Sequence, residues 1–155
     1  LLYLNGQLVN QKQSPNHGGI IRPEILVIHY TDDNSLQGAL SWLCAPQARV
    51  SAHLVIAKTG QIWQLLPFNI KGWHAGVSSY EGRSGVNNFS IGLENVGLGD
   101  EWPEPQIEAN IGVIKALFHT YKLQDCVGHM DIAPGRKSDP GPLYFPILEE
   151  RGVFK

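Results

Sequence analysis

Two histidines, a lysine and an aspartate occupy positions where ionisable side chains need an explanation. His29 lies inside the apolar run EILVIHY, where a buried ring must have its nitrogens hydrogen-bonded or bound to something. His129 follows a glycine in VGHMD, while Lys137 and Asp139 stand in GRKSDPGP, where proline and glycine fix the backbone. Two imidazoles and one carboxylate suit Zn²⁺, and three protein ligands leave a fourth position for water, as in catalytic zinc sites.

The same residues also fit a simpler interpretation. A lone histidine in a strand is more often a hydrogen-bonded core residue than a ligand, and a loop lysine is usually solvated. The chain has no H-E-x-x-H segment and no paired C-x-x-C segments, so no local spacing marks a metal site. From residue chemistry alone, a zinc centre and a purely structural set both stay open.

Strand patterns surround these positions. Residues 24–30 form a continuous, β-branched apolar run, which is typical of a strand buried on both faces. The runs VSAHLVIA and QIWQLLP flank KTG, a pattern that predicts a hairpin. In FSIGLENVG apolar residues alternate with small or polar ones, so Glu94 should point away from the apolar row. A further short strand is expected around CVGHM.

Helical patterns alternate with these strands. Ser35 suits an N-cap for apolar residues at positions 36, 39, 40 and 43, and that helix should end before Pro46. After Pro105, apolar residues recur every three or four positions up to residue 121, which predicts the longest helix. A last short helix is expected near FPILEE. Together the patterns predict an α/β fold: one domain over residues 1–155 with a mixed central β-sheet flanked by helices.

Composition excludes several classes of protein. The 155 residues are 43% hydrophobic and 17% charged, as in ordinary globular domains, and the net charge of -2 offers no footprint for nucleic acid. No apolar run approaches the ~20 residues that span a bilayer, so we expect no transmembrane segment. We interpret Cys44 and Cys126 as unpaired core thiols, and we expect a monomer.

Five motifs, taken together, identify a family. VIHYT, SAHLVI, GWHAGVSSYEGR, NNFSIGLEN and GHMDIAPGRKSDPGP occur here in the order found in bacterial zinc-dependent N-acetylmuramoyl-L-alanine amidases of the amidase-2 superfamily. That group includes AmpD-like enzymes, phage lysozyme-like amidases and peptidoglycan recognition proteins, and the resemblance extends over residues 26–141. It implies zinc-dependent hydrolysis of the amide between N-acetylmuramic acid and L-alanine, with peptidoglycan fragments or anhydromuropeptides as substrate.

The resemblance also implies roles for individual residues. It makes His29, His129 and Asp139 the zinc ligands. Glu94 matches the glutamate assigned as general base in the AmpD-like branch, and Lys137 matches the lysine assigned to transition-state stabilisation. Without a metal nearby, Glu94 would be a surface ion-pair partner and Lys137 a solvated loop residue.

The chain departs from the phage branch at one position and offers further candidates in a long loop. Phage enzymes carry a catalytic tyrosine before the histidine of SAHLVI, whereas this chain has Ala52, so the base role shifts to Glu94. A loop as long and mixed as residues 71–88 is more often a binding loop than a tether. There we expect Trp73 and His74 to line the groove rather than merely anchor the loop, with the Trp73 indole facing sugar or peptide and His74 donating near the scissile amide. The remaining candidates for substrate binding are Arg83, which would clamp a stem-peptide carboxylate, and Asn88.

Other histidines and other functions complete the expectations. We interpret His53 as a hydrogen-bonded structural histidine or one supporting a ligand, and His17 and His119 as solvated. Two alternatives to the amidase are a non-catalytic peptidoglycan-binding module and a zinc peptidase acting within the stem peptide. The first would have lost a zinc ligand, and all three are retained here. For localisation we expect the bacterial cytoplasm, with the periplasm or secretion as the alternative.

Overall fold

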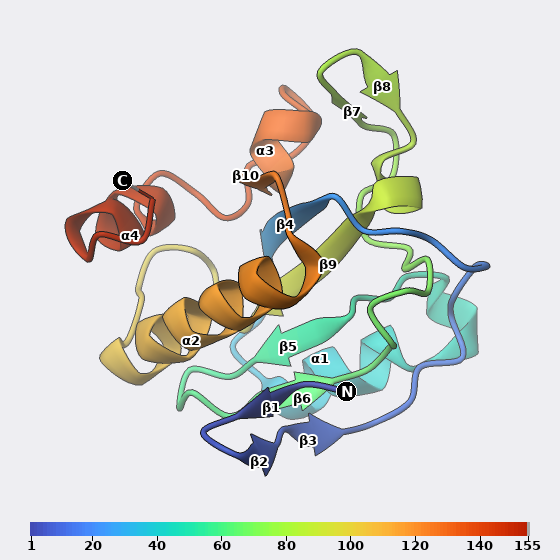
Figure 1. The fold of residues 1–155 in the computed structure, drawn as a ribbon. Helices are drawn as coiled ribbons and strands as arrows, with labels where there is room; N and C mark the ends of the chain where they lie inside the picture. Colours follow the sequence, from blue (N-terminus) through green and yellow to red (C-terminus); the bar gives the residue numbers. More distant parts are fainter. Residues whose placement is uncertain (155) are drawn as a thin grey trace.

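A six-stranded mixed β-sheet forms the centre of the molecule in the computed structural model, which describes residues 1–154 (Figure 1). From one edge to the other the strands are β10 (Asp125–Gly128), β4 (Ile25–Tyr30), β9 (Ser90–Asn95), β5 (Leu54–Ile56), β6 (Ile62–Gln64) and β3 (Asn10–Gln11). The first four strands run parallel; β6 is antiparallel to β5, and β3 is parallel to β6. The prediction of an α/β domain with a mixed central sheet is confirmed, as is the hairpin of β5 and β6.

Helices supply the crossovers that parallel strands require. They are α1 (Leu36–Leu43), α2 (Glu104–Tyr121), α3 (His129–Ile132) and α4 (Tyr144–Glu150), with short 3₁₀ turns η1 (Pro46–Ala48) and η2 (Val86–Phe89). The hydroxyl of Ser35 accepts from Gly38 N at 2.9 Å, which confirms the predicted N-cap of α1. Helix α2 begins one residue before Pro105, not after it, because a proline in the first turn removes no hydrogen bond.

Several short elements carry no periodicity and were not predicted. At the N-terminus β1 (Tyr3–Leu4) pairs antiparallel with β2 (Gln7–Leu8), and β3 then joins the sheet edge. Within the long loop, β7 (Ser79–Tyr80) and β8 (Arg83–Ser84) form a second antiparallel pair. The one-turn helix α3 also escaped prediction, since four residues are too few to show a helical repeat.

The two faces of the sheet are covered by different elements. Alternate residues of β4, β5 and β9 face the largest core, which α2 and α4 complete; these strand residues are Leu26, Ile28, Leu54, Ile56, Ile91 and Leu93. On the other face α1 packs over Val55, while Ile25 and Val27 pack with the long loop and α3. In Figure 1 α2 accordingly lies in front of the sheet and α1 behind it. The α1 face is the one that carries the site.

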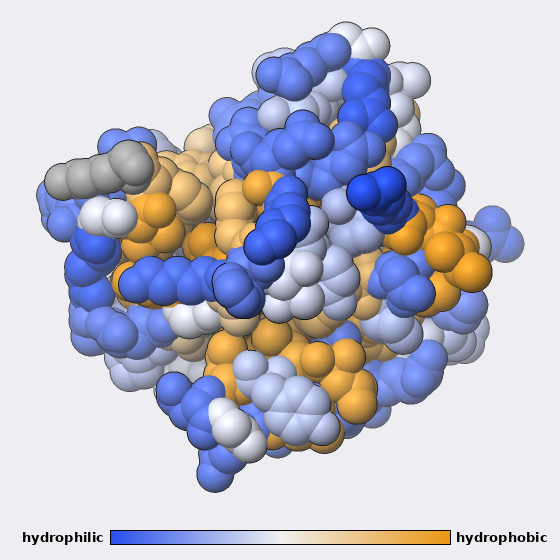
Figure 2. All heavy atoms as spheres, viewed as in Figure 1, coloured by the Kyte–Doolittle hydropathy of each residue, from blue (hydrophilic) through white to orange (hydrophobic). Residues whose placement is uncertain are grey.

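The molecular surface on the α2 side is mostly hydrophilic, with apolar residues gathered in separate patches (Figure 2). Within the described part of the chain, none of the helices combines the length and apolar character needed to cross a bilayer. Cys44 and Cys126 are free thiols, as predicted. Burial raises the pKa of the Cys126 thiol, which keeps it protonated and unreactive.

Candidate metal centre and active site

His29 reaches the site because of strand alternation. In β4 the residues Ile25, Val27 and His29 share one face, opposite the face that packs on α2. Its side chain is almost completely buried, with 1% of the residue exposed. An imidazole placed there therefore lies on the sheet face away from α2, near the carboxyl end of the parallel strands.

His129 and Asp139 arrive from the end of the neighbouring strand. β10 runs parallel to β4 and ends at Gly128, paired with Ile28, so His129 begins α3 directly beside the carboxyl end of β4. The following loop folds back on this point, where Met130 N donates to Asp139 O at 2.9 Å. Gly128 permits this approach, because a Cβ there would lie 2.6 Å from Pro140 Cδ.

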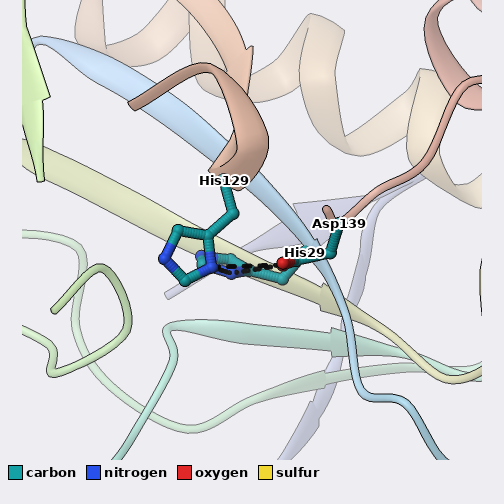
Figure 3. Close-up of side chains that lie close together, drawn as sticks. All are labelled: His29, His129 and Asp139. Atoms are coloured by element: carbon teal, nitrogen blue, oxygen red, sulfur yellow. Dashed lines mark hydrogen bonds and ion pairs between the residues drawn. The ribbon is translucent and has the colours of Figure 1, made fainter. Parts of the chain in front are cut away.

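The three predicted ligands converge on one point (Figure 3). His29 Nδ1 lies 3.0 Å from Asp139 Oδ2 and 3.1 Å from His129 Nδ1, and His129 Nδ1 lies 3.2 Å from Asp139 Oδ2. All three residues are buried. Residues up to 110 positions apart in sequence thus present two nitrogens and one oxygen to a common centre.

The hydrogen-bond partners of these rings indicate that the centre suits a cation. His129 Nε2 lies 2.8 Å from Ala75 O, which can only accept, so Nε2 carries the proton and Nδ1 presents a lone pair. Three electron-rich atoms this close repel one another unless a positive charge lies among them. Burial lowers the pKa of His29, which disfavours the doubly protonated, charged ring at neutral pH. Residues His29, His129 and Asp139 therefore fit a metal ion.

Glu94 lies next to this centre because of the sheet register. β4 and β9 run in parallel with His29 opposite Glu94, and both side chains are on the same face. Glu94 Oε2 lies 3.9 Å from His29 Nδ1, while Oε1 is buried and has no hydrogen-bond partner among the described residues. Burial, reinforced by the charge of Asp139, raises the pKa of Glu94 well above its usual range. A carboxyl group with a raised pKa beside a metal position suits a general base, because proton transfer is most efficient when the pKa of the base lies near the working pH.

A cavity of about 470 Å³ opens over these residues. Its lining includes Trp42 of α1, the ends of β4 and β9, Trp73 of the long loop, and the loop that carries Lys137. Turns hold this loop, since Lys137 N donates to Ala133 O at 3.0 Å and Gly141 N donates to Ser138 O at 2.8 Å. Lys137 thus stands on a fixed backbone at the cavity wall.

Of the four candidates for substrate binding, two line the cavity and two do not. Trp73 is half-buried and lines the cavity. His74 also lines it, but both ring nitrogens are engaged within the protein, so a donor role toward substrate is not supported. Arg83 pairs with Glu24 in a two-pronged ion pair at 2.9 and 3.0 Å, away from the cavity.

Asn88 does not line the cavity, and its exposed side chain turns back to donate to Gly85 O at 3.1 Å, so its role in substrate binding stays a prediction. The residue that shapes the loop is instead its neighbour Asn87, whose Oδ1 accepts from His74 N and Ala75 N. Sequence reasoning also missed Arg136, which donates to Ala75 O at 2.7 Å. The only sequence signals for these two were the adjacent NN pair and the basic pair before Ser138.

His53 is buried beside the site and is hydrogen-bonded to backbone on both sides. Gly92 N donates to its Nδ1 at 3.0 Å, and its Nε2 donates to Ile70 O at 2.7 Å. The ring is therefore satisfied without a metal, as expected for a structural histidine. Burial lowers its pKa to about 4.

Acid is expected to destabilise the protein through His53. An unfolded histidine binds a proton near pH 6.5, whereas the folded pKa is about 4, so the unfolded state gains protons first as the pH falls. The stability contribution is complete above about pH 7 and declines between about pH 6.5 and 4, reaching a loss of about 2 kcal/mol at pH 5. Urea unfolding of metal-free wild type and His53→Gln at about pH 7 and at pH 5 measures this loss of stability. A difference between the two proteins that does not change with pH contradicts the prediction.

Comparison with known proteins places this geometry in a family. Residues 21–142 match the N-acetylmuramoyl-L-alanine amidase family. The chain is 35% identical to the 1,6-anhydro-N-acetylmuramyl-L-alanine amidase AmpD of Escherichia coli K12, in an alignment that covers 93% of this chain and 92% of that protein. It is 39% identical to the N-acetylmuramoyl-L-alanine amidase AmiD of the same strain, covering 85% of this chain and 54% of that protein.

Solved structures agree with the sequence matches. A crystal structure of AmpD superposes with a TM-score of 0.85 at 31% identity, with both chains covered completely. AmiD from E. coli, in complex with the substrate anhydro-N-acetylmuramic acid-L-Ala-D-gamma-Glu-L-Lys, gives a TM-score of 0.77 at 33% identity, covering 91% of this chain and 61% of that one. The resemblance carried by the five motifs is confirmed, and the chain belongs to the amidase-2 family of N-acetylmuramoyl-L-alanine amidases.

Proposed function

We propose that the protein hydrolyses the amide between the lactyl group of N-acetylmuramic acid and L-alanine, using Zn²⁺ held by His29, His129 and Asp139. The observation that carries the proposal is the convergence of these three ligand atoms beside the unpartnered carboxylate of Glu94, in a chain of this family. Two nitrogens and one carboxylate oxygen are a donor set typical of catalytic zinc.

Bound zinc would polarise the amide carbonyl and bring the pKa of a bound water near 7, as a Lewis acid. The protein's own residues provide the rest. Glu94, whose Oε2 lies 3.9 Å from His29 Nδ1, accepts the proton of the attacking water and returns it to the departing nitrogen of L-alanine. One O–H bond and the C–N bond break, and the products are a free lactyl carboxyl group and a peptide with a free amino terminus.

Lys137 stabilises the negative charge that develops on the carbonyl oxygen. Lys137 lines the cavity, and backbone hydrogen bonds hold the loop that carries it. Lys137→Met is expected to lower kcat by about 10²–10³, because removal of one such donor typically costs that much. Single-turnover rates and zinc content measure the effect. A variant that loses zinc as well as activity would contradict a role confined to the transition state.

The substrate is a peptidoglycan fragment that fits the cavity. Trp73 and Trp42 are placed to contact a sugar ring, since indoles offer flat apolar faces. Because the relative AmiD has been crystallised with an anhydromuropeptide, soluble anhydromuropeptides are the first substrates to test. A monomer acting in the cytoplasm is the expected form; size-exclusion chromatography and cell fractionation with an antibody test it.

The deciding experiment offers a defined anhydromuropeptide to the zinc-loaded protein and weighs the products by mass spectrometry. The amidase releases an intact stem peptide that begins with L-alanine, together with a peptide-free anhydromuramic sugar. Cleavage inside the stem peptide would identify a zinc peptidase instead. Binding of the fragment without any product would identify a peptidoglycan-binding module.

A further inference from the structure

A line of hydrogen-bonding groups runs from Ser90 through His74 to His29, behind the metal centre. His74 Nδ1 lies 3.0 Å from His29 Nε2, and His74 Nε2 lies 3.1 Å from Ser90 Oγ. The two imidazoles meet edge to face, with ring centroids 5.1 Å apart and an angle of 85° between the planes. All three residues are buried.

The metal-binding role of His29 decides which atom donates in each hydrogen bond along this line. His29 Nδ1 faces His129 Nδ1 and Asp139 Oδ2, so as a metal ligand it must present a lone pair there. Its proton is then on Nε2 and is donated to His74 Nδ1. His74 in turn carries its proton on Nε2 and donates it to Ser90 Oγ. A neutral His74 with an accepting Nδ1 is thus the state that matches a metal-binding His29.

The position of His74 is built into the sheet and the loop. Ser90, Gly92 and Glu94 lie on the same face of β9, and the His74 ring covers Gly92. A Cβ at Gly92 would lie 2.5 Å from His74 Cγ, so only glycine leaves room for the ring. The Oδ1 atom of Asn87 accepts from His74 N at 3.1 Å, which fixes the loop above the strand.

Ala75, the residue after His74, hydrogen-bonds to the other histidine ligand, His129. Ala75 O accepts from His129 Nε2 at 2.8 Å, and Asn87 Oδ1 accepts from Ala75 N at 2.9 Å. Consecutive residues of one loop therefore hold the outer nitrogens of both imidazole ligands. Partners of this kind fix the tautomer and orientation of a metal-binding histidine.

We propose that His74 is a positioning residue, which holds His29 in the Nε2-protonated tautomer with Nδ1 aimed at the metal, and does not contact the substrate. The inference rests on the proposed zinc site and adds a residue to which sequence reasoning gave a different role. Loss of an outer partner typically weakens metal affinity by about 10–100-fold. His74→Leu is expected to show a loss of that size.

Three variants test the proposal, with zinc dissociation constants measured by competition with a chromophoric chelator. His74→Leu removes the acceptor, while His74→Asn restores one, because asparagine Oδ1 occupies the place of histidine Nδ1 and should recover most of the lost affinity. His53→Gln is the matched control. That histidine is also buried, with its ring centroid 5.9 Å from that of His74, but it hydrogen-bonds to backbone. It should lose stability and keep wild-type zinc affinity.

Ring ¹⁵N NMR of the zinc-loaded proteins gives a second readout that a purely structural role would not move. Wild type should show the His29 Nε2–H proton shifted downfield and protected from exchange by its hydrogen bond to His74 Nδ1, with His74 protonated on Nε2. His74→Leu should lose that shift and that protection. Wild-type zinc affinity together with an unchanged His29 Nε2–H signal in His74→Leu overturns the inference while leaving the amidase proposal standing. Wild type that binds no zinc overturns the proposed function and the inference with it. If His74→Leu does not fold, His74→Asn and the wild-type spectrum decide the role of His74.

Discussion

Asp139→Ala is expected to lower both zinc affinity and kcat/KM by at least ~10²-fold. Asp139 supplies the one oxygen ligand, and even outer partners of ligands contribute about 10–100-fold to affinity. Its buried carboxyl is stable as an anion: burial opposes ionisation, but the imidazoles of His129 and His29 hold its pKa well below the usual range. Zinc content after dialysis and single-turnover hydrolysis measure the two losses.

Thermal unfolding provides the control for that variant. Zinc at 100 times its dissociation constant should stabilise wild type by about 2.7 kcal/mol, and at the same concentration should stabilise Asp139→Ala far less. Asp100→Ala, at an exposed aspartate, should respond to zinc as wild type does. If Asp139→Ala retains the zinc-dependent rise in Tm, Asp139 is not a ligand.

Glu94→Gln is expected to lower kcat by about 10²–10⁴ while zinc affinity stays close to that of wild type. The amide has the shape of the carboxyl group but cannot accept the proton of water, and general base catalysis contributes about that factor. Glu94 Oε1 has no hydrogen-bond partner in the described residues, so the substitution breaks no contact there. Rates under single turnover, zinc content and urea unfolding together measure the change.

A second variant of Glu94 separates the effect of losing the base from the effect of moving it. Glu94→Asp keeps a base but withdraws it by one methylene, so it should recover part of the activity that Glu94→Gln loses. Equal activity of Glu94→Gln and wild type would show that another group accepts the proton. Loss of zinc from Glu94→Gln would instead make Glu94 a ligand.

Much of the framework follows from local patterns in the sequence. Alternation in residues 89–97 predicted that Glu94 points away from the apolar row, and Glu94 indeed lies on the face opposite Ile91 and Leu93. The apolar run of residues 24–30 likewise predicted β4, and the N-cap at Ser35 predicted the start of α1. These features depend on neighbours within a few positions, which sequence periodicity records.

Features that depend on distant partners were not accessible in this way. Arg83 was matched to a substrate carboxylate, but Glu24, 59 positions away, supplies one within the fold. His74 was expected to donate to substrate, whereas its nitrogens are held by residues 16 and 45 positions away. The room for its ring comes from Gly92, whose missing side chain leaves no pattern in the sequence. The partners of the His74 ring nitrogens depend on how β4 and β9 are paired, because these strands carry His29 and Ser90. Residues close in sequence do not record that pairing.

The pairing of β10 with β4 has a consequence for how the protein folds. It brings His129 beside His29 across 100 positions and Asp139 across 110, so the centre exists only after the chain has closed a very long loop. Closing such loops is slow and comes before the contacts that reward it. Zinc therefore finds its full set of ligands only in molecules that have nearly finished folding. It should slow unfolding far more than it accelerates folding, and so lengthen the lifetime of the native state.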